Sequence, residues 1–157
     1  MAATILTPKE NVLLKHGWHG LFAVFQGLVL SPLVLVNPAA FAGAALGAAA
    51  LTGGLGAVAM KLKTSFEKYE KILMVGLGAI ALASLGSLVL PGAAALVASK
   101  ISYLGGFALF SGLVVHDTHK ARSKAQFINF DPIKHSMDIY LDTINLLVRF
   151  WEMFGKK

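Results

Sequence analysis

The sequence predicts an all-α integral membrane protein, a single membrane domain over residues 1–157 built as a bundle of about five transmembrane helices. The first observation is composition. Hydrophobic residues make up 56% of the chain, charged residues make up only 14%, and the mean hydropathy is +0.69. An average soluble domain is about a quarter charged, and a soluble fold of this size cannot hide so much apolar surface. The lipid bilayer is therefore the first partner that the sequence predicts.

The second observation is that the apolar residues fall into long runs. A helix needs about 20 apolar residues to cross a bilayer, and these runs are that long or nearly so. They also lack the period-two alternation of membrane barrel strands. We expect five spans, at about residues 17–36, 39–60, 72–90, 93–115 and 133–154.

Proline and lysine mark the limits of these spans. Ser31-Pro32 predicts a kink in the first span, and Asn37-Pro38 closes it. Pro91-Gly92 closes the third span. The fourth run contains Lys100, so we expect its helix to start near Ile101.

The second span consists almost entirely of Ala, Gly and Leu. Its Gly43-xxx-Gly47 and Gly53-Gly54-xx-Ala57 spacings are typical of membrane helices that pack closely. We therefore expect a buried helix here rather than a flexible linker.

The basic residues predict the topology. With five crossings, ten of the fourteen Lys and Arg residues fall on one face: Lys9, Lys15, Lys61, Lys63, Lys68, Lys71, Lys120, Arg122, Lys124 and Lys134. This places the N-terminus and both long loops inside, in the cytosol or the mitochondrial matrix. The net charge of +6 is thus explained by topology, and no nucleic-acid partner is expected. Met1–Glu10 resembles neither a signal peptide nor a convincing presequence, so the targeting signal is internal or already removed.

The fifth span carries a polar stripe. Its members recur at intervals of three and four residues, which places them on one helix face: His135, Asp138, Asp142, Asn145, Arg149 and Glu152. Two interpretations remain open. The helix lies on the membrane surface with its stripe in water, or the stripe faces the bundle interior or a water-filled path.

Asp117 ends the fourth span. If the fourth and fifth helices pack antiparallel, Asp117 and Asp142 are neighbours, and two close carboxylates share a proton. This arrangement would respond to pH. The alternative is that Asp117 is only a hydrated residue at a helix end.

Evidence for catalysis or metal binding is weak. His116 and His119 are three residues apart, and His135 could supply a third nitrogen, but two histidines at a membrane interface are commonplace. The sequence therefore predicts no metal site, with these histidines as the weak candidates. It contains no cysteine, and no G-x-S-x-G, H-E-x-x-H or phosphate-binding glycine loop. We expect no enzyme, no catalytic residue and no resident cofactor other than surrounding lipid.

Several motifs resemble a known family. His116-Asp117-Thr118-His119 resembles the Tyr-Asp-Thr-Gln motif that closes the penultimate helix of Bax-inhibitor family membrane proteins, and 140–146 resembles that family's final-helix signature. Four further stretches are similar to the mitochondrial branch of the family: 53–60, 75–78, 84–91 and 130–133.

The resemblance implies a bundle of seven helices, six around the last, and calcium leak or calcium–proton exchange gated by a carboxylate pair. Asp117 and Asp142 correspond to that pair, with Asp138, Asn145 and Arg149 as supporting polar residues. It also implies the mitochondrial inner membrane, cristae organisation and a link to the respiratory chain. The N-terminus and long loops would then lie on the matrix side.

Five spans fall short of the family's seven, and the sequence predicts that the first two are missing. A bundle without those helices leaves its polar stripe open to lipid, so we expect other membrane subunits, or a second copy, to cover it. This favours a non-catalytic accessory subunit of a mitochondrial inner-membrane assembly, associated with the respiratory chain or its supercomplexes. The alternative is a calcium leak channel or calcium–proton exchanger gated by the aspartates. A zinc-dependent activity at the histidines ranks third.

Overall fold

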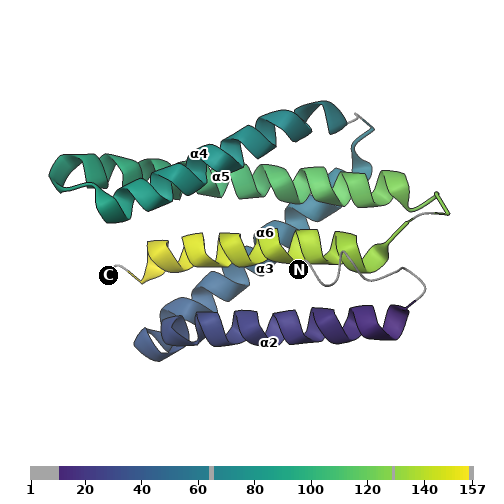
Figure 1. The fold of residues 1–157 in the computed structure, drawn as a ribbon, viewed down its shortest axis with the longest axis horizontal. Helices are drawn as coiled ribbons and strands as arrows, with labels where there is room; N and C mark the ends of the chain where they lie inside the picture. The colour runs from purple at the N-terminus through teal and green to yellow at the C-terminus, as the bar shows by residue number, and fades with distance from the viewer. Residues whose placement is uncertain (1–10, 64–65, 129, 156–157) are drawn as a thin grey trace.

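The computed structural model describes residues 11–63, 66–128 and 130–155, and this part of the chain is all-helical. Its five α-helices are α2 (Val12–Val36), α3 (Pro38–Lys61), α4 (Glu70–Val89), α5 (Gly92–Lys124) and α6 (Pro132–Phe154), with a 3-10 turn, η1 (Glu67–Tyr69), before α4 (Figure 1). The helices α2 to α5 are each long and apolar enough to cross a membrane. The prediction of a helical membrane protein is therefore confirmed. Met1–Glu10 and three of the basic residues, Lys9, Lys156 and Lys157, lie outside the described residues.

Capping residues explain where two of the helices begin. The Asn37 side chain accepts a hydrogen bond from the Ala40 N–H at 3.0 Å, and Pro38 occupies the first turn of α3. Asp131 caps α6 in the same way, accepting from the Lys134 N–H at 3.2 Å, with Pro132 in the first turn. In both helices the capping side chain accepts a hydrogen bond from an N–H that has no partner within the helix. The proline lies in the first turn, where the N–H that it lacks would have no such partner either.

The fourth span differs from its prediction. The helix α5 starts at Gly92 and runs through Lys100 without a break, so the expected start near Ile101 is wrong. Lysine is a good helix former, and the Lys100 side chain is exposed, so it does not interrupt the helix. At 33 residues α5 is about 50 Å long, longer than the hydrocarbon core of about 30 Å. The helix therefore extends past the predicted end at residue 115 and carries its final polar turns to Lys124.

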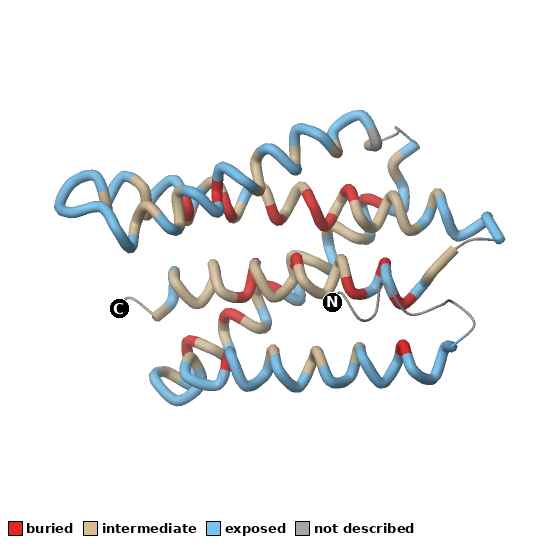
Figure 2. Tube along the Cα trace, in the orientation of Figure 1, coloured by how far each residue is buried: buried red, intermediate tan, exposed pale blue. Residues whose placement is uncertain are grey.

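The helix α6 occupies the middle of the bundle. It packs on α3 and α5, α4 packs mainly on α5, and α2 makes fewer contacts, with α3 and α6 (Figure 1). Buried residues gather on the facing sides of α3, α5 and α6, whereas α2 and α4 are mostly exposed (Figure 2). The core includes Ala44, Ala48, Val114 and Leu146. In a bilayer, the exposed apolar sides of α2 and α4 face lipid.

The small residues of α3 act in two different ways. Gly47 lies beneath the Phe150 ring and Gly43 beneath Phe154, as their spacing predicts. A hydroxyl contact of 3.2 Å between Thr52 and Thr143 continues the same interface. Close packing at Gly53 and Gly54 is not found among the described residues, because no atom outside their own helix turn lies within 4 Å of the position of a Cβ on either glycine. A spacing identifies small residues on a helix but not the face that meets a neighbour.

The long connections meet at one end of the bundle (Figure 1). Lys120 Nζ donates to Glu70 Oε1 at 2.7 Å, and Arg122 donates to the Met60 and Leu62 carbonyls at the end of α3. At the same end, Lys15 pairs with Asp131. The start of α2 and the two long connections therefore lie on one side, as the distribution of basic residues predicts.

Candidate functional site

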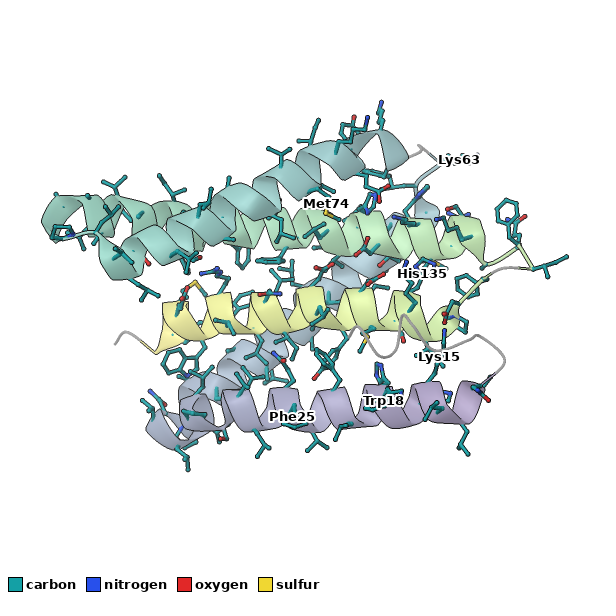
Figure 3. The ribbon with its side chains drawn as sticks, in the orientation of Figure 1. Lys15, Trp18, Phe25, Lys63, Met74 and His135 are labelled. Atoms are coloured by element: carbon teal, nitrogen blue, oxygen red, sulfur yellow. The ribbon has the colours of Figure 1, made fainter. Side chains whose placement is uncertain are left out.

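A groove of about 480 Å³ lies between α4 and α6, with α5 as its floor. Its α4 wall is mostly apolar and includes Met74 and Leu77; Figure 3 labels Met74 on α4. Its polar side chains come from α5 and α6: Asp117, Asp138, Asp142, Asn145 and Arg149. The groove remains because α4 and α6 both pack on α5 and make little or no contact with each other. The structure thus brings all five predicted residues to one cavity.

The stripe on α6 faces inward. Asp142 is only 6% exposed, and the opposite side of α6 packs its apolar residues, such as Leu147, against the core. A helix lying on the membrane surface would expose its stripe to water. Of the two interpretations that the sequence leaves open, the structure supports the interior one.

Asp117 and Asp142 face each other across the α5–α6 contact. Both line the groove, and they are close enough for the charge of one to act on the other. Asp117 also bonds to the buried His116, with 2.8 Å between His116 Nδ1 and Asp117 Oδ1. Asp142 Oδ2 is buried without a hydrogen-bond partner among the described residues. Such a group is ordinarily satisfied by water, a proton or a cation.

The other two polar residues of the groove bond along their own helix. Asn145 Nδ2 donates to the Leu141 carbonyl at 2.9 Å. Arg149 Nη1 donates to Glu152 Oε2 at 3.2 Å. Arg149 therefore lines the same cavity as Asp142, but its ion pair points the other way along α6.

The histidines do not gather into a metal site. His119 packs against the Phe66 ring at 5.5 Å between centroids, and His135, labelled in Figure 3, stacks on Phe130 at 5.2 Å. His116 is hydrogen-bonded to Asp117 instead. Within the described ranges, no three His, Asp or Glu side chains lie close enough together to hold a metal ion. The zinc hypothesis for His116, His119 and His135 finds no support in this geometry.

Two features escaped the sequence analysis. One is an ion pair between the buried Lys15 and the partly buried Asp131, which are 116 positions apart. Burial by itself raises the pKa of the Asp131 carboxyl, but hydrogen bonds from Lys15 and the Lys134 N–H outweigh it, so this pKa lies below its ordinary value. Nothing in the sequence marks this pair except Lys15's position in the first turn of a membrane helix.

The other feature is a serine cluster between α4 and α5. Ser84 Oγ and Ser102 Oγ are 2.6 Å apart, and Ser87 and Ser99 line the same small cavity. A signal was present, because Ser84 and Ser87 are three residues apart, as are Ser99 and Ser102. That spacing places each pair on one helix face.

Comparison with known proteins agrees with the motifs. The family model for the inhibitor of apoptosis-promoting Bax1 matches residues 1–157. The growth hormone-inducible transmembrane protein of Rattus norvegicus is 33% identical over 152 residues, an alignment that covers 90% of this chain and 43% of the rat protein. This chain thus spans less than half the length of that relative. No solved structure matches it.

Proposed function

Since this chain belongs to the Bax-inhibitor family of membrane proteins, we propose that it passes a cation through the membrane under the control of protons. Calcium is the substrate that the family resemblance implies. The proposal is carried by one observation. The Asp142 carboxylate is buried in the groove beside Asp117, with one oxygen unpartnered among the described residues. We propose no enzymatic activity.

Physical chemistry links proton and cation at such a carboxylate. A buried negative charge is costly at membrane depth unless something compensates it. A proton on Asp142 or a cation beside it would each do so, and the two would compete. Passage also requires binding weak enough to release the ion. No three acidic or histidine side chains converge on one point among the described residues, which suits transient occupancy better than a resident metal.

The test is calcium flux into proteoliposomes that hold the full chain, measured across pH. We expect a pH-dependent flux that loses its pH dependence in Asp142→Asn and in Asp117→Asn. The control is Glu70→Gln, which removes a carboxylate outside the groove, next to Lys120. The control should keep the wild-type profile. A wild-type chain without pH-dependent flux would contradict the proposal.

A second candidate is the accessory membrane subunit of a mitochondrial inner-membrane assembly, associated with the respiratory chain. The observation in its favour is that α4 and α6 make little or no contact, so the groove has a side that another protein helix could cover. The expectation of missing helices is the argument for this role. We place passage first because Asp117 and Asp142 line the same groove.

The location proposed for either role is the mitochondrial inner membrane, with the long loops on the matrix side. Native electrophoresis of mild-detergent extracts from fractionated mitochondria tests location and role together. Migration with a respiratory complex supports the accessory role. Migration alone, in the inner-membrane fraction, supports passage by this chain itself.

A further inference from the structure

A second polar cavity, of about 220 Å³, adjoins the acidic groove towards the turn between α4 and α5. It is lined by serine hydroxyls and by Glu152, and it contains none of the three aspartates. The two cavities have two lining residues in common, Ser84 and Arg149. The Arg149 side chain therefore stands where the acidic groove meets the serine cavity.

The Arg149 guanidinium packs against Gly106 of α5. A Cβ on Gly106 would lie 2.9 Å from Arg149 Nε and 3.2 Å from Cζ. A larger residue at this position would force the guanidinium to shift. On its other side Arg149 pairs with Glu152 at 3.2 Å, and the side chain is 13% exposed. The cation is thus held from two helices.

We propose that Arg149 is the charge-selective gate between the two cavities, a role that rests on the proposed passage of cations through the groove. Arginine stays charged at any physiological pH, so it repels a metal cation that leaves the aspartates. It also pairs with Glu152, the one carboxylate among the described residues that line the serine cavity, so Glu152 is not free to attract such a cation. Serine hydroxyls can hold water, so protons and neutral water face a lower barrier there than a divalent ion.

The first experiment probes the cavity directly and needs no ion flux. The chain has no cysteine, so Ser99→Cys supplies a single thiol in the serine cavity. Cationic and anionic methanethiosulfonate reagents are applied from the side of the long loops, and their reaction rates are compared. We expect Arg149→Gln to raise the rate of the cationic reagent about tenfold and not to raise that of the anionic one. Arg149→Lys, which keeps the charge, should stay near the parent rate.

Two further variants keep the test sound if Arg149→Gln fails to fold. Gly106→Ala displaces the guanidinium from its place against Gly106. It should also raise the reaction rate of the cationic reagent, but by less than Arg149→Gln does. Glu152→Gln removes the negative charge that pairs with Arg149 and should lower the reaction rate of the cationic reagent. If the cationic reagent reacts at the same rate in the parent and in all these variants, Arg149 is not the gate.

Calcium flux through the same variants separates the gate from the proposed function. If both hold, Arg149→Gln raises the flux, and Asp142→Asn removes its pH dependence. A pH-dependent flux that Arg149→Gln leaves unchanged overturns the gate and retains the proposed function. A changed thiol rate without any calcium flux retains the gate between the cavities and overturns passage of calcium.

Discussion

The Phe150 ring of α6 lies directly over Gly47 of α3, and a Cβ on Gly47 would be 3.2 Å from the nearest ring carbon. The glycine lets the two helices approach as closely as the ring allows, and Phe150 also meets Phe107 of α5 edge-on at 5.2 Å between centroids. One aromatic side chain thereby joins three helices. In membranes, where the hydrophobic effect drives no association between helices, close packing of this kind holds them together.

Gly47→Leu should therefore separate α3 from α6. Overpacking of this kind costs about 1–3 kcal/mol, and we expect a lower melting temperature in detergent. Gly53→Leu is the matched control, since it makes the same change on the same helix where no atom lies within 4 Å. Equal melting temperatures for the two variants would argue against the α3–α6 interface.

A second prediction concerns topology. Single cysteines at Lys63 and Gln126 lie in the two long connections, and one at Ala93 lies beside the turn between α4 and α5. A membrane-impermeant thiol reagent should label the first two from one side of sealed vesicles and Ala93→Cys only from the other. The parent chain has no cysteine and supplies the unlabelled control. Labelling of positions 63 and 126 from opposite sides would refute the arrangement.

A third prediction concerns Arg122, which donates to the Met60 and Leu62 carbonyls where α3 ends. The last carbonyls of a helix lack partners within it, so the guanidinium caps α3 and ties it to α5. Arg122→Gln should cost about 1 kcal/mol and increase hydrogen exchange at residues 58–63. Lys124→Gln removes a nearby positive charge that makes no such bond. If Lys124→Gln increases hydrogen exchange at residues 58–63 as much as Arg122→Gln does, then the loss of a positive charge, and not the loss of the cap, explains the change.

The helices and the polar stripe of α6 were predictable because hydropathy and residue spacing are local properties of the chain. The intervals of three and four between Asp138, Asp142 and Arg149 determine that they share a face. The partner of that face depends on packing, which is why surface and interior interpretations were both open. For the same reason Gly47 and Gly53 look alike in the sequence, although only Gly47 meets another helix.

Other features could not be read from local pattern. Lys100 breaks an apolar run without breaking its helix, because a helix depends on backbone geometry while hydropathy depends on side chains. Two contacts join residues that are far apart in the chain: Arg149 packs against Gly106, and Lys15 pairs with Asp131. Only the fold brings such residues together.

The last prediction follows from the Lys15–Asp131 pair. Among the described residues α2 makes few contacts, mainly with α3 and α6, so the Lys15–Asp131 pair is a major attachment of its first turn. Lys15 is 3% exposed, and removing the Asp131 charge leaves a buried ammonium group uncompensated. Asp131→Asn keeps a side chain that can cap α6 but loses the charge. We expect it to destabilise the protein by about 1–3 kcal/mol and to loosen α2, seen as faster hydrogen exchange over residues 12–20.

The pH dependence of this attachment has a definite sign. The pKa of Asp131 is lower in the folded protein than its ordinary value of 3.8, so the folded state binds fewer protons than the unfolded state. Stability from the pair is fully present above the unfolded pKa and is lost as the pH falls through the folded pKa. Melting temperatures in detergent between pH 7 and pH 3 should show a loss below about pH 4 that is smaller in Asp131→Asn. Lys134→Gln, which changes an exposed lysine in the first turn of α6, should keep the wild-type profile. If Asp131→Asn loses as much stability below pH 4 as the wild type, the pair is not the acid-sensitive attachment of α2.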